Sequence, residues 1–137
     1  MATILVIDDD KYIRKTLVKI LEKEGYQVME AADGEIGLRL CFEHKPQLVI
    51  TDIVMPNVDG LEVITRLRKE LPSVKIIAIS GGGHRIGIDL ALETAASLGI
   101  EHTIKKPYER SDIVDTVKKI ISEGTWSAPG LSQNPPA

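Results

Sequence analysis

The sequence predicts an α/β fold in which helices cover both faces of a five-stranded parallel sheet. Short apolar runs alternate along the chain with longer segments whose apolar residues recur at helical spacing. This alternation is typical of right-handed βαβ units, which build parallel sheets. Acidic or hydroxyl residues directly follow three of the apolar runs, at the sheet edge where open parallel sheets bind their ligands.

The predicted strands are short runs rich in aliphatic and β-branched residues. They cover Thr3–Ile7, Gln27–Ala31, Gln47–Thr51, Lys75–Ser80 and His102–Lys105. The first, third and fourth runs are continuously apolar, as expected of strands that are buried on both faces. The second and fifth are more polar, as edge strands should be. This difference favours the strand order 2-1-3-4-5 of the flavodoxin-like doubly wound (βα)5 sandwich.

Five helices are predicted between and after these strands. Apolar stripes at i, i+4, i+7 and i+8 lie within residues 13–21 and 113–121, and a third stripe within 61–71 ends at Pro72. The segments 34–43 and 88–98 are the other two helices. Asp10 is placed to cap the first helix, Ser111 to cap the last, and Gly25 to end the first.

The composition is ordinary for one globular domain, with 43% hydrophobic and 27% charged residues among 137. The net charge of -3 argues against general affinity for nucleic acids or anionic membranes. No apolar stretch approaches the roughly 20 residues that cross a bilayer. The single cysteine, Cys41, excludes an intrachain disulfide and indicates a reducing compartment, so cytoplasm is the expected location.

The helical pattern stops after Glu123. The segment 124–137 contains several prolines and glycines and has no periodicity. We therefore expect residues 1–123 to form the domain and residues 124–137 to be a flexible tail or a truncated linker.

Three carboxylates are predicted to meet at the carboxyl edge of the sheet, because Asp8 and Asp9 follow the first strand and Asp52 follows the third. Carboxylates that converge repel each other unless a cation lies between them. Oxygen ligands of this kind suit a hard divalent ion of the Mg²⁺ type. Alternatively, Asp8 to Asp10 only cap a helix and Asp52 only begins a turn, which explains one acidic strand end but not two neighbouring ones.

Ser80 and Lys106 follow the fourth and fifth strands and are predicted to complete a site that accepts a phosphoryl group. Asp52 can attack phosphorus to form an acyl phosphate. The metal and Lys106 would supply positive charge around the phosphoryl oxygens, and Ser80 would donate a hydrogen bond to one of them. Singly, the serine is an ordinary turn residue and the lysine an ordinary solvated charge; their joint placement favours the functional interpretation.

From Thr3 to about Glu123 the chain resembles the receiver domain of a two-component response regulator, of the stand-alone type found among chemotaxis regulators. The motifs that carry the resemblance are Asp8-Asp9, Asp52 with Met55-Pro56 and Asp59-Gly60, Ser80-Gly81, and Lys106-Pro107. Each motif is weak alone, but the ordered set is very specific.

The resemblance implies that Asp52 is the phosphoacceptor and takes its phosphoryl group from a histidine kinase or phosphotransfer protein. It implies that Mg²⁺ is held directly by Asp9, Asp52 and the carbonyl of Val54, with Asp8 acting through water. It also implies switch roles for Ser80 and Lys106, a cis peptide bond before Pro107, and a Lys105 side chain that points away from the site.

The chain departs from the family pattern at three places. Thr103 stands where the family often has an aromatic residue, and Tyr108 does not replace it. The stretch from Ser80 to Lys106 is longer than usual, and Gly81, Gly82, Gly83 and His84 within it form a possible transmitter loop. Val54 and Gly82 occupy positions that are polar in many receivers, which leaves the rate of dephosphorylation open.

The predicted function is therefore a phosphorylatable switch that signals to an unknown output protein, catalyses only its own phosphorylation and dephosphorylation, and binds neither nucleic acid nor membrane directly. The chain would be a single-domain regulator, an intermediate of a phosphorelay or, alternatively, a receiver excised from a larger regulator. A phosphatase with an aspartyl-phosphate intermediate would need a substrate pocket or cap, for which 137 residues leave no room. A flavin-binding module would place a phosphate beside the acidic cluster, which would repel it.

Overall fold

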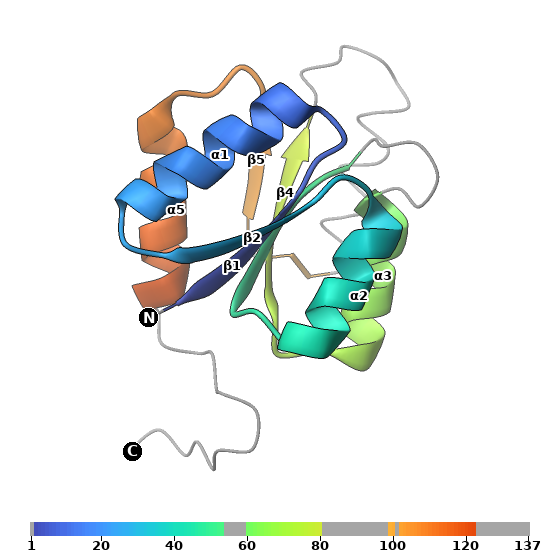
Figure 1. Ribbon diagram of the computed structural model, residues 1–137. Coiled ribbons are helices and arrows are strands. Elements are labelled where there is room, and N and C mark those ends of the chain that lie inside the picture. The colour runs from blue at the N-terminus through green and yellow to red at the C-terminus, as the bar shows by residue number, and fades with distance from the viewer. Residues whose placement is uncertain (1, 54–59, 81–98, 101, 123–137) are drawn as a thin grey trace, which may run out of the picture.

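Five parallel strands form one sheet in the order β2-β1-β3-β4-β5, which confirms the predicted topology. The computed structural model describes residues 2–53, 60–80, 99–100 and 102–122. In chain order the elements are β1 (Thr3–Ile7), α1 (Lys11–Lys23), β2 (Gln27–Ala31), α2 (Gly34–His44), β3 (Leu48–Asp52), α3 (Gly60–Glu70), β4 (Lys75–Ser80), β5 (His102–Lys105) and α5 (Arg110–Ser122). Helices α1 and α5 cover one face of the sheet and α2 and α3 the other (Figure 1).

Several predicted features lie outside the described residues. They are the helix 88–98, the carbonyl of Val54 with the rest of the loop that precedes Gly60, the residues Gly81, Gly82, Gly83 and His84, and the segment 124–137. Within the part of the chain that is described, no helix is long and apolar enough to cross a membrane.

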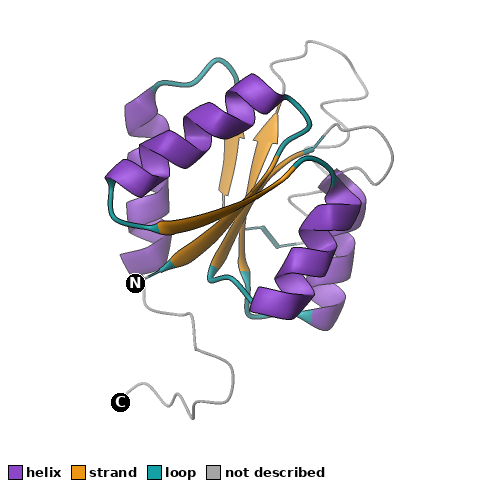
Figure 2. Cartoon of the chain, viewed as in Figure 1, coloured by secondary structure: helices purple, strands orange, loops and turns teal. Residues whose placement is uncertain are grey.

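Each face of the sheet carries its own apolar core, because successive side chains of a strand point to opposite faces. In β1, Ile4 and Val6 pack with residues of α1 and α5, whereas Leu5 and Ile7 pack with residues of α2 and α3. All four side chains are almost completely buried. The layering of helices, sheet and helices in Figure 2 follows from this alternation. Because all the strands are parallel, their carboxyl ends lie at one edge of the sheet.

The third strand extends one residue further than predicted, to Asp52 rather than Thr51. The extension is stabilised by β4, since Asp52 pairs with Ile79 and the Ile53 N–H donates to the Ile79 carbonyl at 3.0 Å. The sequence pattern did not show this extension because a charged residue usually marks the end of a buried strand. As a result, the backbone of Asp52 is held within the sheet.

The helix ends confirm two predictions and correct one. The Asp10 carboxylate accepts a hydrogen bond from the Ile13 N–H at 3.1 Å and caps α1, and Gly25 ends this helix with a φ of 95°. The prediction that Ser111 caps the last helix was wrong, because α5 already begins at Arg110. The Asp112 carboxylate reaches back instead and accepts the Glu109 N–H at 2.7 Å.

Candidate functional site

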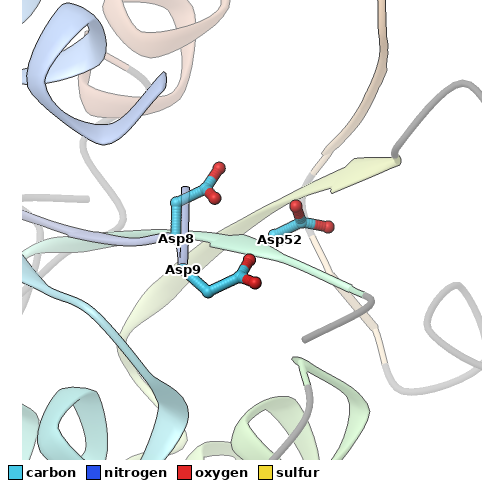
Figure 3. A group of neighbouring side chains, drawn as sticks. All are labelled: Asp8, Asp9 and Asp52. Atoms are coloured by element: carbon cyan, nitrogen blue, oxygen red, sulfur yellow. The ribbon is translucent and has the colours of Figure 1, made fainter. Parts of the chain in front are cut away.

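The neighbouring strands β1 and β3 bring Asp8, Asp9 and Asp52 together at their carboxyl ends, as Figure 3 shows. One carboxylate oxygen of each residue lies within 4.8 Å of the others. Their exposure differs, because Asp8 is 1% and Asp52 6% exposed whereas Asp9 is open to solvent. The cluster therefore has a buried floor and an accessible rim, which a small ion or phosphoryl group could reach.

Lys106 places its ammonium group against this cluster. Its Nζ lies 3.3 Å from Oδ2 of Asp52 and 3.9 Å from Oδ2 of Asp8, and its side chain is 19% exposed. The adjacent Lys105 is exposed, in line with the expectation that its side chain points away from the site. The peptide bond between Lys106 and Pro107 is cis, as the resemblance implied.

Ser80 reaches the same edge through the sheet register. It is the last residue of β4, and it pairs with Lys105 while its predecessor Ile79 pairs with Asp52. The backbone of Ser80 thus lies between the phosphoacceptor candidate on β3 and the lysine that follows β5. The structure thus brings four predicted site residues from four strands to the carboxyl edge of the sheet: Asp8, Asp52, Ser80 and Lys106.

The Asp8 carboxylate is electrostatically strained. Its Oδ1 accepts the Asp10 N–H at 2.8 Å, but its Oδ2 is buried and has no hydrogen-bond partner. The pKa of Asp8 is raised from 3.8 to about 6, chiefly by burial and also by repulsion from Asp52 and Asp9, while the Asp10 N–H and Lys106 act in the opposite direction. A buried carboxylate oxygen without a hydrogen bond, beside two more carboxylates, fits a site for a hydrated divalent cation.

Gly60 contributes to the site in a way that the sequence did not reveal. It is buried at the start of α3, and its N–H donates to the Ile53 carbonyl at 2.9 Å. A Cβ atom at this position would overlap with the carbonyl oxygen of Asp52 and lie 2.6 Å from Cα of Ile53. The Asp-Gly pair in the sequence was the only signal. The absence of a side chain at Gly60 lets α3 pack directly on the backbone that carries Asp52.

Tyr108 also lies near the carboxylates. It is half-buried against the core between the sheet and helices α1 and α5. Burial raises the pKa of its hydroxyl to about 12, and the negative charges of Asp8 and Asp52 contribute in the same direction. The phenol therefore stays protonated at physiological pH and adds no charge to the site.

Comparison with known proteins agrees with this geometry. The family model described as the response regulator receiver domain matches residues 4–118. Sporulation initiation phosphotransferase F of Bacillus subtilis (strain 168) is 31% identical over 118 residues, which are 86% of this chain and 92% of that protein. The alkaline phosphatase synthesis transcriptional regulatory protein PhoP of the same organism is 32% identical over 126 residues, 92% of this chain, which spans only 51% of that relative.

Solved structures show the same relationship. A response regulator receiver domain protein from Clostridium thermocellum is 30% identical with a TM-score of 0.81, covering 90% of this chain and 96% of the other. A CheY-like receiver domain protein from Methanospirillum hungatei JF-1 is 28% identical, also with a TM-score of 0.81, covering 90% and 95%.

Members of the matching family are signalling switches that bind Mg²⁺ at an acidic pocket, and they are not enzymes that turn over an external substrate. The acidic cluster at the ends of β1 and β3 has the composition of such a pocket. With a family match over most of its length and a sheet of the same topology, the chain belongs to the response regulator receiver domains, the phosphorylatable switches of two-component signalling.

Proposed function

We propose that this chain accepts a phosphoryl group on Asp52 in a Mg²⁺-dependent reaction and signals the change to a partner protein. The observation that carries the proposal is the grouping of Asp52 with two further carboxylates and with the Lys106 ammonium at 3.3 Å. The Asp52 carboxylate lies in the buried floor of the cluster, beside the accessible Asp9, and is flanked by the charges that phosphoryl transfer needs.

The proposed donor is a phosphohistidine of a histidine kinase or of a phosphotransfer protein. An Asp52 oxygen forms the new bond to phosphorus as the bond between phosphorus and the histidine nitrogen breaks, and the histidine leaves with that electron pair. Lys106 already ion-pairs with Asp52 and can follow the new negative charge onto the phosphoryl oxygens. Ser80, at the end of β4, is proposed to donate a hydrogen bond from its hydroxyl group to one of these oxygens.

Asp8, Asp9 and Asp52 are proposed to hold Mg²⁺, together with the carbonyl of Val54. The buried Oδ2 of Asp8 accepts no hydrogen bond, which supports this assignment, because a water molecule bound to the metal could donate one to it. Mg²⁺ held by these residues would supply positive charge beside the phosphoryl group. The same charge would offset the repulsion among the three carboxylates.

The proposed output is a partner protein, and the net charge of -3 leads us to expect no direct binding of nucleic acid or membrane. A cytoplasmic location stays a prediction from the single cysteine. A receiver that is part of a larger regulator is the second candidate, since the chain spans about half of the PhoP relative. The chemistry at Asp52 would be the same in both cases.

Incubation with acetyl phosphate and Mg²⁺, followed by intact-mass measurement, tests the phosphoacceptor. We expect one phosphoryl group on the wild-type chain and none on Asp52→Asn, because the amide cannot act as the nucleophile. Asp10→Asn is the matched control, because the Asp10 side chain caps α1, which asparagine can also do, and its backbone N–H to Asp8 is retained, so labelling should stay intact. Labelling of Asp52→Asn to the wild-type level would contradict the assignment.

A truncation tests the proposed boundary between a domain of residues 1–123 and the remaining segment. Removing residues 125–137 should leave the urea midpoint and the labelling unchanged, because the described buried residues of α5 end at Ile120. Removing residues 117–137 should destabilise the domain by several kcal/mol, since Val117 and Ile120 are 0% and 5% exposed and each contributes about 1.5 to 3 kcal/mol when buried. If the chain without residues 125–137 fails to fold, the domain must extend beyond residue 123.

A further inference from the structure

The backbone of Asp8 is held from outside its own strand. Its N–H donates to the Ala31 carbonyl at the end of β2 at 3.1 Å, and its carbonyl accepts a hydrogen bond from Nη1 of Arg14 on α1 at 2.8 Å. Ladder pairing between β1 and its neighbours stops one residue earlier, at Ile7. These two hydrogen bonds therefore fix the backbone position of Asp8, the first residue after β1.

Arg14 is itself fixed by an acidic partner. Its Nε donates to Oε1 of Glu30 at 2.9 Å, and its side chain is only 11% exposed. Side chains of a helix lean toward its N-terminus, so Arg14 in the first turns of α1 can reach back to the carbonyl of Asp8, two residues before the helix cap Asp10. The guanidinium thus bridges Glu30 of β2 and the carbonyl of Asp8. It can do so because its N–H donors are held in a rigid planar arrangement.

The carbonyl that Arg14 binds belongs to the peptide unit between Asp8 and Asp9. Because a peptide unit is planar, fixing the direction of the Asp8 carbonyl also fixes the N–H and Cα of Asp9. Asp9 is exposed and is the proposed metal ligand at the rim of the site. Mg²⁺ demands nearly ideal octahedral geometry, so its affinity depends on how well the two adjacent carboxylates are oriented.

We propose that Arg14, oriented by Glu30, is a positioning residue that sets the affinity of the acidic cluster for Mg²⁺. The inference rests on the proposed function of that cluster. Arg14 acts through the Asp8 backbone and touches neither the metal nor the phosphoryl group. Groups that orient metal ligands typically change metal affinity by 10- to 100-fold when they are removed.

Lys15 provides a matched control within the same cluster. Its Nζ pairs with Oε2 of Glu30 at 2.8 Å, but its side chain is half-exposed and the described contacts of Lys15 do not include Asp8. Lys15→Met therefore removes a positive charge and an ion pair from Glu30 while leaving the hydrogen bond from Arg14 to Asp8 in place. A general effect of charge would raise Mg²⁺ affinity in both variants, because each loses a positive charge near the cation site. Loss of positioning would lower the affinity in Arg14→Met alone.

The experiment is a titration of the full chain with MgCl₂ followed by amide NMR, beside urea unfolding in EDTA. We expect Arg14→Met to weaken Mg²⁺ binding by about tenfold, Lys15→Met to stay within about twofold of the wild type, and Arg14→Lys to lie between, because one ammonium cannot replace the fork. The unfolding curve separates a loss of stability from a loss of affinity. If Arg14→Met does not fold, Glu30→Gln, which releases the Nε of Arg14 from its charged partner, should weaken binding severalfold.

The outcomes separate this inference from the proposed function. Wild-type affinity for Mg²⁺ in folded Arg14→Met, or in Glu30→Gln where that variant replaces it, would overturn the inference alone. Equal weakening in Lys15→Met and Arg14→Met would also overturn it, because the effect would then not depend on the hydrogen bond from Arg14 to Asp8. Failure of the wild-type chain to bind Mg²⁺ at all would overturn the proposed metal site and this inference with it.

Discussion

Asp8→Asn is expected to stabilise the metal-free domain at neutral pH. Asp8 is 1% exposed, and burial together with Asp52 and Asp9 raises its pKa to about 6 from 3.8. Asparagine has nearly the same shape, and its carbonyl oxygen can still accept the Asp10 N–H. The substitution therefore removes a buried negative charge without opening a cavity, which distinguishes it from most changes in a protein core.

The sign of the pH dependence follows from the raised pKa. Between about pH 4 and pH 6 the folded chain keeps a proton on Asp8 that the unfolded chain releases, so stability falls as the pH rises through this window. Above about pH 6 Asp8 is ionised in both states, and the loss of stability reaches its full value. A pKa difference of about two units corresponds to about 2 to 3 kcal/mol of free energy of unfolding. Asp8→Asn should recover most of this difference at pH 7 and none of it near pH 3.

Urea unfolding in EDTA between pH 3 and pH 8 measures the effect. The wild-type chain should lose stability relative to Asp8→Asn as the pH rises, and the two curves should converge at low pH. Asp9→Asn is the control, because Asp9 is exposed and contributes least to the pKa shift of Asp8, so a smaller gain is expected. Adding Mg²⁺ should stabilise the wild-type chain more than Asp8→Asn. Parallel curves at all pH values would show that the Asp8 charge is not strained.

The fold was predictable from local patterns because the strands differ in polarity. Gln27 in β2, and His102 and Lys105 in β5, are exposed at the two edges, whereas Leu48 and Ile76 in the central strands are fully buried. Burial on both faces requires a continuous apolar run, so the composition already distinguished the two edge strands from the three central ones. The start of the last helix was predicted wrongly because Ser111 is a residue type that often caps helices. The sequence did not show that the Asp112 side chain would instead accept a hydrogen bond from the Glu109 N–H.

The acidic cluster was predictable for a related reason. In a parallel sheet the carboxyl ends of all strands lie at one edge, so residues that end strands close together in the sheet order lie near each other, whatever their distance in sequence. Asp8, Asp52 and Lys106 follow this rule, and their proximity needed no knowledge of side-chain conformations.

The contacts that support the cluster were not predictable in this way. Arg14 stands beside the apolar stripe of α1, and nothing in the helical period shows that it binds the carbonyl of Asp8 and pairs with Glu30. Gly60 is adjacent to an acidic residue in a turn-like sequence, which indicates a bend and not a close approach of two backbones. Such contacts join segments that are distant in sequence, and they depend on packing that only the folded chain defines.

Gly60→Ala is expected to impair both folding and phosphorylation, because the new methyl group would overlap with the backbone that carries Asp52. Overpacking typically costs about 1 to 3 kcal/mol, and an overlap with backbone atoms is at the upper end because they cannot rotate away. The roughly 1 kcal/mol by which alanine exceeds glycine in helix propensity offsets only part of this cost. The carboxylate of Asp52 must shift with its backbone, and a misplacement of about 1 Å slows a reaction on the order of a hundredfold.

Gly37→Ala is the matched control. Gly37 is a buried glycine near the start of α2, on the same face of the sheet, and a Cβ there would overlap with the side chain of Ile7 and not with backbone. Since a side chain can change its rotamer, Gly37→Ala should lose stability but keep its rate of labelling by acetyl phosphate within a few-fold of the wild type. Urea unfolding and the initial labelling rate should therefore separate the two variants. A wild-type labelling rate in folded Gly60→Ala would show that Asp52 does not depend on the close approach of α3.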